Sequence, residues 1–254
     1  SYAAVINGVG VVIEVNSQTD FVAKNEIFQN FVKDLATVVA EQAPADVEAL
    51  KACTYPGTDR TVTDVTNDRV LSIGENLQIR RFVRYTEGVN VPYIHMNGKI
   101  GVMVNLEVSG IEDTAAVEEL GKDLAMQIAA MNPGYISSDE IPAEIVEQEK
   151  AVQLAKALEE GAANTKIPAE KAKMIAENKV KGRMNNFFAE VCLLNQAFVK
   201  ENKVTVGDHV KAVAKSLGGT IVVKAFTRFE TGEGIEKQEE DYAAEVASLA
   251  GMTK

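Results

Sequence analysis

The sequence repeats itself, and this repeat constrains the possible folds more than any other feature. Residues 2–15 and 93–106 each contain two β-rich runs joined by Asn-Gly, at Asn7-Gly8 and at Asn97-Gly98. A two-residue Asn-Gly connection is typical of a β-hairpin, because both positions of a type I′ turn need a positive φ. The pattern therefore predicts two copies of one hairpin, 90 residues apart.

Each predicted hairpin is followed by a helix and a third strand. Apolar residues at helical spacing predict helices over 28–39 and 117–131, and both contain Lys-Asp-Leu-Ala, 89 residues apart. The third strands are expected at 77–85 and 221–229, now 144 residues apart. These elements predict an α+β fold of two duplicated units, each with a three-stranded antiparallel sheet plus helices.

The larger spacing between the third strands places an insertion of about 54 residues in the second copy. Ile-Pro-Ala-Glu occurs at 141–144 and again at 167–170, and Pro followed by Glu is typical of a first helical turn. We expect an inserted antiparallel coiled-coil hairpin over 141–194, with helices from about 143 to 160 and from about 169 to 194.

Both helices of this predicted arm carry apolar residues at coiled-coil spacing. The second helix has a stripe of six, and the first has three: Ala176, Val180, Met184, Phe187, Val191 and Leu194, and Ala151, Ala155 and Leu158. Two interpretations remain open. The hairpin packs on itself, or its surface meets a second chain and forms a homodimer through the helical arm.

The predicted organisation has four parts. They are a core N-subdomain at 1–91, a core C-subdomain at 92–140 and 195–229, the helical arm at 141–194, and a C-terminal tail helix at 230–254. Within the tail, Tyr242, Val246 and Leu249 would share one helical face.

Charge and composition argue against several classes of partner. The 37 acidic and 26 basic residues give a net charge of −11, whereas nonspecific binding of nucleic acid needs a basic face. No apolar run approaches the roughly 18 residues of a membrane span. Cys53 and Cys192 lie far apart, which suits a reducing cytoplasm better than a disulfide framework. We therefore expect a cytoplasmic chain with no direct nucleic-acid or membrane partner.

Sequence signatures of enzymes are scarce. The Gly-Lys pairs at 98–99 and 121–122 lack the Ser or Thr of a phosphate-binding loop, and there is no G-x-S-x-G nucleophile elbow. His95 falls in a predicted strand and His209 near a helix start, without a second histidine at metal-ligand spacing. We expect no catalytic residue, no metal site and no cofactor.

The two copies differ most in the loop after the hairpin. Residues 16–25 of the first copy contain Asp20-Phe21-Val22, which has no counterpart near 107–114 of the second. Ser17 or Thr19 is a plausible helix N-cap. Either Phe21 and Val22 pack into the core beneath the following helix, or the loop presents an exposed carboxylate beside an exposed aromatic ring. The second arrangement would be a hot spot for a protein partner.

The loop at 16–25, Asn-Ser-Gln-Thr-Asp-Phe-Val-Ala-Lys-Asn, resembles a signature of the translation elongation factor Ts family. Further matching segments follow in family order: 73–76 with Arg80-Arg81, 126–130, 182–184 and 228–237. The resemblance implies guanine-nucleotide exchange on elongation factor Tu, a GTPase of translation. Family members usually carry a small helical module ahead of this core, whereas this sequence begins at the first predicted strand.

The resemblance also implies roles for particular residues. The exchange loop, which would enter the G domain of elongation factor Tu and disturb its Mg²⁺ and phosphate site, consists of Thr19, Asp20, Phe21 and Val22. In that picture Phe21 is a wedge between helices of the partner. Further partner contacts are expected at Lys24, Asn25, Met126, Gln127 and Met131. The helical arm corresponds to the coiled-coil module of the family.

Two other functions are alternatives to nucleotide exchange. A structural module would act through self-association of the arm, and it would leave nucleotide release from the GTPase unchanged. An α+β enzyme would need carboxylates or histidines gathered in a pocket by the fold. Periodicity and spacing alone indicate only a duplicated α+β binding protein with a helical arm.

Overall fold

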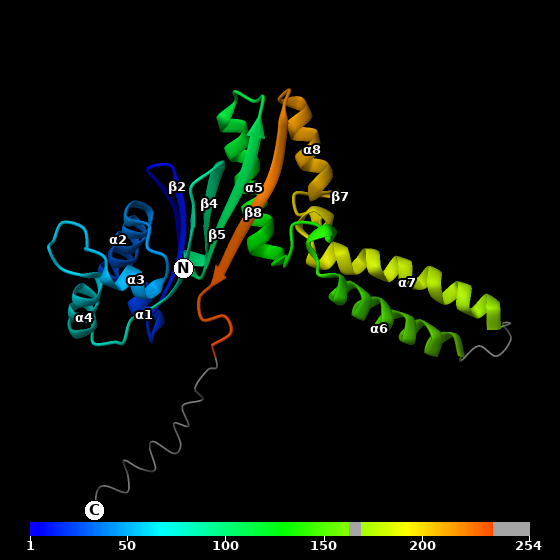
Figure 1. Ribbon diagram of the computed structural model, residues 1–254, viewed down its shortest axis with the longest axis horizontal. Coiled ribbons are helices and arrows are strands. Elements are labelled where there is room, and N and C mark those ends of the chain that lie inside the picture. Colours follow the sequence, from blue (N-terminus) through cyan, green and yellow to red (C-terminus); the bar gives the residue numbers. More distant parts are fainter. Residues whose placement is uncertain (163–168, 236–254) are drawn as a thin grey trace, which may run out of the picture.

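A computed structural model describes residues 1–162 and 169–235 of the chain (Figure 1). The first unit contains β1 (Tyr2–Ile6), β2 (Val9–Asn16), α1 (Asp20–Ala23), α2 (Glu26–Gln42), α3 (Val47–Ala52), α4 (Val62–Ile73) and β3 (Gln78–Tyr85). The second contains β4 (Val89–His95), η1 (Met96–Gly98), β5 (Ile100–Ser109), α5 (Thr114–Met131), η2 (Ser138–Glu140), η3 (Leu193–Asn195), β6 (Ala197–Phe198), β7 (Glu201–Thr205), α8 (Val206–Ser216) and β8 (Thr220–Glu230). The arm consists of α6 (Ala143–Ala162) and α7 (Ala169–Val191).

Two antiparallel three-stranded sheets form the centre of the molecule, with strand orders β1-β2-β3 and β4-β5-β8. The prediction of an α+β fold with two such units is confirmed. A two-stranded β6-β7 sheet was not predicted. The predicted division of the chain into subdomains stays a prediction, and most of the expected tail helix lies outside the described residues.

The two Asn-Gly hairpins differ in their turns. Asn7 and Gly8 have φ values of 51° and 82°, and Ile6 pairs directly with Val9, as a two-residue turn requires. The second two-residue turn was predicted wrongly, because His95 pairs with Ile100 and four residues connect the strands. The Lys99 carbonyl there accepts a hydrogen bond from Thr231 N–H at 2.9 Å, so a tertiary contact helps to set this turn.

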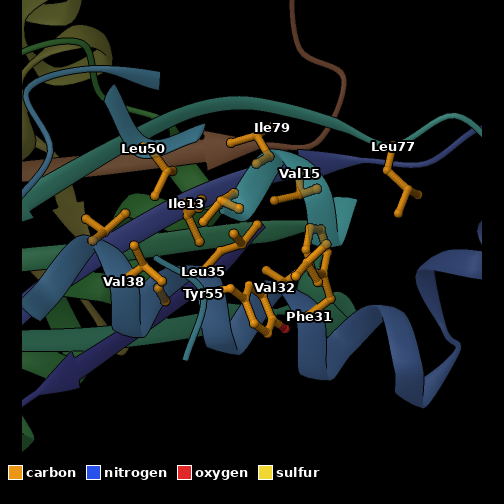
Figure 2. Close-up of a cluster of buried hydrophobic side chains, with 14 of the residues drawn as sticks. Ile13, Val15, Phe31, Val32, Leu35, Val38, Leu50, Tyr55, Leu77 and Ile79 are labelled. Atoms are coloured by element: carbon orange, nitrogen blue, oxygen red, sulfur yellow. The ribbon is translucent and has the colours of Figure 1, made fainter. Parts of the chain in front are cut away.

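Strand β2 is buried on both faces, which explains its uninterrupted apolar run. Alternate residues point to opposite faces of a strand. Val11, Ile13 and Val15 face the core beneath α2, whereas Val12 belongs to a small cluster that includes Met103 of the other sheet. Figure 2 shows the first core, in which side chains of β2, α2, α3 and β3 meet around Leu35 and Leu50.

The duplication extends to matching interactions at the helix ends. Arg84 of β3 donates to the carbonyl oxygen of Ala40 in α2, and Arg228 of β8 donates to that of Ala129 in α5. A cation at a helix C-terminus is favourable because the unpaired carbonyls there carry partial negative charge. The sequence match between the third strands therefore reflects a shared packing role.

Helices α4 and α8 are a further matched pair that the sequence analysis missed. Both have a threonine N-cap, Thr61 and Thr205, and these lie 144 residues apart. Each threonine hydroxyl accepts from the backbone N–H of an aspartate three residues on, Asp64 or Asp208. The motif Thr-Val-x-Asp at the spacing of the third strands was the signal that could have revealed them.

The arm projects away from the sheets as an antiparallel helix pair (Figure 1). On α7, Ala176 and Met184 are buried as predicted. The prediction for α6 was wrong, because Ala151, Ala155 and Leu158 are exposed while Ala157 is buried. Helix α7 also ends at Val191 instead of Leu194. The backbone of Cys192 forms an isolated β-bridge with that of Tyr135, whose carbonyl accepts from Leu193 N–H at 2.9 Å. The chain therefore leaves the helix to pair with the segment at Tyr135.

Close packing of α5 on β4 yields a stability prediction. A methyl group added at Gly121 would lie 2.4 Å from Cγ2 of the buried Val91. Overpacking costs about 1–3 kcal/mol, whereas alanine favours a helix by about 1 kcal/mol over glycine. Gly121→Ala should therefore lower the free energy of unfolding in urea. Gly182→Ala is the control, because its Cβ would meet nothing within 4 Å. The control should be neutral to stabilising, and a stabilised Gly121→Ala protein would contradict this packing.

No helix in the described part of the chain is both long and apolar enough to cross a membrane.

Candidate functional site

Two consecutive helix caps hold the loop that follows β2. Thr19 is the N-cap of α1, and its hydroxyl accepts from Val22 N–H at 3.4 Å. Asn25 is the N-cap of α2, and its side chain accepts from Ile27 N–H at 2.8 Å. Such side chains satisfy backbone donors that a helix start leaves unpaired. Of the two predicted N-caps, Thr19 is the one observed, and Ser17 instead donates to the Thr19 carbonyl.

The single turn of α1 sends two adjacent apolar side chains in different directions. Val22 is 9% exposed and packs in the core with Phe28. Phe21 is 87% exposed, because successive helical residues point about 100° apart. Asp20 beside it is also exposed. Each earlier interpretation is therefore right for one residue: Val22 fixes the turn to the core, and Phe21 projects into solvent.

A carboxylate from a distant segment fastens this turn from its other side. Glu75, just after α4, accepts from the backbone N–H groups of Gln18 and Thr19 at 2.9 and 3.0 Å, and from the Thr19 hydroxyl at 2.5 Å. The hydrogen bond from this hydroxyl is the main reason that the pKa of the Glu75 carboxyl lies below its ordinary value. Glu75 lies in the family segment at 73–76, but no role was predicted for it.

The base of the loop is polar and only partly buried. Both polar atoms of the Asn16 side chain are buried without a hydrogen-bond partner among the described residues. Of the polar side chains on either side of Ser17, Gln18 reaches the Glu75 segment, through a 3.4 Å contact from Asn76 N–H to its amide oxygen. The contacts that order the loop therefore come mainly from Glu75.

A groove of about 760 Å³ runs beside the loop. Thr19, Asp20 and Lys24 line one side of it, and the turn between β4 and β5 lines the other with Met96 and Lys99. Met96 is 63% exposed. The groove combines apolar and charged groups, and it adjoins the turn that carries the exposed ring of Phe21.

The predicted contact residues do not all lie at this loop. Lys24 and Asn25 are exposed beside it. Met126, Gln127 and Met131 lie on α5 of the second unit, and none of them lines the groove. Met131 is 47% exposed and Met126 is half-buried.

Gln127 is fully buried and uses its amide internally. It donates to the Gln196 side chain and to the Ala197 carbonyl, both at 3.1 Å, and it accepts from Val199 N–H at 2.8 Å. Gln127 thus fixes the segment leading into β6, and a direct contact with a partner would require that segment to move.

Below the loop, β2 carries a fully buried carboxylate, Glu14. It accepts from Arg80 at 2.9 Å, from Arg81 at 2.5 Å and from the Gly232 N–H at 3.0 Å. A β-bulge opposite Glu14 brings these two successive arginines to one carboxylate. Burial alone would raise the pKa of the Glu14 carboxyl, but these hydrogen bonds hold it below its ordinary value. Through Gly232, the cluster ties the chain after β8 to the strand that leads into the loop.

The histidines in the described part of the chain contact aromatic side chains, and the cysteines there form no disulfide. His95 lies in β4 and forms a 3.0 Å hydrogen bond with the Tyr93 hydroxyl. His209 stacks on Phe198 with 4.1 Å between ring centroids. Cys53 and Cys192 are both free. No group of three or more His, Cys, Asp or Glu side chains within the described ranges could hold a metal ion.

Comparison with known proteins gives one consistent family. Residues 18–233 match the family model described as Elongation factor TS. The chain is 47% identical over 242 residues to "Elongation factor Ts" of Syntrophotalea carbinolica, covering 94% of this chain and 77% of that protein. It is 47% identical over 242 residues to the protein of the same name from Clostridioides difficile, covering 95% and 76%. For the Magnetococcus marinus protein, identity is 42% over 246 residues, covering 96% and 78%.

Proposed function

The chain belongs to the elongation factor Ts family and is a translation elongation factor, and on this premise we propose that it is a guanine-nucleotide exchange factor for elongation factor Tu. It binds the GDP-bound GTPase and promotes release of GDP by disturbing the Mg²⁺ and phosphate site. The proposed role needs no catalytic residue and no cofactor of the chain itself. Because translation takes place in the cytoplasm, the proposal places the chain there.

The observation that carries this proposal is the exposed ring of Phe21 on the capped single turn of α1. An exposed aromatic side chain is costly in solvent, and aromatic residues are enriched among the hot spots of protein interfaces. In the proposal, Thr19, Asp20 and Phe21 enter the G domain of the partner, where the Phe21 ring is a wedge between helices. Val22 anchors the same turn to the core.

Exchange follows from linked binding equilibria. If the chain weakens nucleotide binding, the nucleotide weakens binding of the chain by the same factor. Shifting a two-state equilibrium from 1:99 to 99:1 requires about 5.5 kcal/mol of differential binding. A hot spot at Phe21 together with a broad contact can supply this free energy. Disturbing the Mg²⁺ of the partner removes a large positive charge from its phosphates, which speeds release of GDP.

The proposed broad contact includes both units. Lys24 and Asn25 extend the loop contact, whereas Met126 and Met131 of α5 face the third domain of the GTPase. Gln127 takes part by fixing the segment at 196–199. The exposed side chain of Met131 supports its assignment as a direct contact.

The proposal is tested by release of a fluorescent GDP analogue from elongation factor Tu. A substoichiometric amount of the chain should accelerate release over many turnovers, because the chain is regenerated when nucleotide rebinds. Release at the spontaneous rate, with the chain shown to be folded, would contradict the proposal.

Self-association through the arm stays a prediction with its own test. Ile145 and Val152 are exposed on α6 and lie seven residues apart, on one helical face. If two chains meet there, replacing both with serine should shift the sedimentation coefficient from dimer to monomer. A wild-type chain that sediments as a monomer at tens of micromolar would contradict the prediction.

A further inference from the structure

The duplication provides an internal comparison for Glu75. Gly74 caps the C-terminus of helix α4 with a φ of 81°, and the matching Gly218, two residues after the end of α8, has a φ of 77°. These glycines are 144 residues apart, the spacing of the third strands and of the two threonine caps. The residue after each glycine is therefore equivalent: Glu75 in the first unit and Gly219 in the second.

The two residues meet equivalent points of the chain. Strand β2 matches β5 at an offset of 91 residues, and β3 matches β8 at an offset of 144. The pair Glu14–Arg81 of the first sheet thus corresponds to the pair Asn105–Ala225 of the second. Gln18, whose N–H donates to Glu75, thus corresponds to Ser109. A Cβ added at Gly219 would lie 2.3 Å from the carbonyl oxygen of Ser109.

The contact between the residue after the glycine and the end of the strand therefore differs between the two units. In the second unit the backbone at Gly219 packs directly against the strand end, with no room for a side chain. In the first unit a carboxylate fills the corresponding place and accepts three hydrogen bonds from Gln18 and Thr19. Only the first unit carries the loop with the projecting Phe21.

We propose that Glu75 is the positioning residue of the exchange loop: it holds Gln18 and Thr19 so that Phe21 projects before the partner arrives. This inference rests on the proposed function. Thr19 transmits the effect, because its hydroxyl donates to Glu75 and accepts from Val22 N–H at the start of α1. The backbone order of the loop is then established in the free chain, and binding does not have to provide it.

The variant Glu75→Ala removes all three hydrogen bonds. We expect it to slow stimulated GDP release about tenfold, the factor that corresponds to ordering roughly one additional backbone residue on binding. Glu75→Gln keeps an acceptor oxygen without the charge, and its rate of stimulated GDP release should lie between those of the wild type and Glu75→Ala. The control is Glu48→Ala, which changes an exposed glutamate of α3 that pairs with Lys51 and should leave the rate unchanged.

A double-mutant cycle separates positioning from a general effect on the fold. If Glu75 acts by placing Phe21, its replacement should add nothing once the ring is gone, so Glu75→Ala with Phe21→Ala should match Phe21→Ala alone. Multiplication of the two single losses would overturn the proposal, because it would show that Glu75 acts independently of the ring. An unchanged exchange rate in Glu75→Ala would overturn it as well.

Amide hydrogen exchange measures, in the absence of the GTPase, whether Glu75 holds Gln18 and Thr19. The N–H groups of Gln18 and Thr19 should exchange at least about tenfold faster in Glu75→Ala, with the thermal midpoint of unfolding unchanged. If the wild-type chain failed to stimulate GDP release from the GTPase, the proposed function would be wrong. This measurement would still show whether Glu75 orders the loop in the free chain. Equal protection of both amides in the two proteins would overturn the proposal.

Discussion

Replacing Phe21 by alanine is expected to slow the stimulated release of GDP from elongation factor Tu by about 30-fold or more. Loss of a hot-spot side chain costs about 2 kcal/mol or more of binding, and each 1.36 kcal/mol corresponds to a factor of ten in rate. The ring is 87% exposed, so its removal should change the free energy of unfolding by less than about 0.5 kcal/mol. Stopped-flow fluorescence and urea unfolding measure the two effects.

The matched control is Leu71→Ala. Leu71 lies on α4 and is 83% exposed, so this change also removes a large apolar side chain from the surface. The account predicts wild-type release rates for this variant. If Leu71→Ala slowed release as strongly as Phe21→Ala, loss of exposed apolar surface would explain the result and the wedge would not.

Replacing Glu14 by glutamine is expected to have the largest effect on stability. Its carboxylate is fully buried and contacts both Arg80 and Arg81. Breaking a buried ion pair by removing one partner costs about 3–5 kcal/mol, and the lower end applies because the two arginine side chains are 22% and 32% exposed. The variant should therefore lose about 3 kcal/mol in urea unfolding.

The control for this change lies at the matching bulge of the second sheet. Glu107 pairs there with Lys224 at 2.9 Å, but their side chains are 62% and 55% exposed. Exposed pairs contribute about 0–1 kcal/mol, so Glu107→Gln should be nearly neutral. Equal losses in the two variants would contradict the assignment of Glu14 as a buried anchor.

The effect of Glu14 should depend on pH in a defined direction. The pKa of its carboxyl is lowered in the folded chain, so its contribution to stability is fully present above the unfolded pKa of about 4.3. The contribution is then lost as the pH falls through the folded pKa. The difference in stability between wild type and Glu14→Gln should therefore be constant from pH 5 to 7 and shrink below about pH 4. A difference that grew in acid would contradict the sign of the shift.

Local sequence predicted best where local interactions decide the structure. Asn7-Gly8 has the positive φ values of a two-residue turn, and Thr19 caps α1 through its own hydroxyl. The duplicated sheets were predictable because each β-rich run is short and local, and because the runs recur at fixed spacings along the sequence. Asn97-Gly98 failed because Thr231, from the far end of the described chain, binds the same turn.

Other features depend on contacts that a pattern of residue types does not specify. The apolar face of α6 was misassigned because alanines carry little apolar area, so several faces fitted α7 almost equally. The contact of Gln127 with the partner stays a prediction, whereas the hydrogen bonds of its amide with residues 69 to 72 positions away could not be read from the sequence. The role of Glu75 required the fold to bring it to a loop 56 residues earlier.

The central claim is that Phe21 makes binding of the chain incompatible with tightly held nucleotide, and two affinities test it most directly. They are the affinities of the chain for nucleotide-free and for GDP-bound elongation factor Tu, measured by titration calorimetry. We expect wild type to bind the nucleotide-free form at least about 100-fold more tightly, and Phe21→Ala to lose most of this preference. A wild-type chain that bound both forms equally would contradict the account, because such binding cannot shift the nucleotide equilibrium.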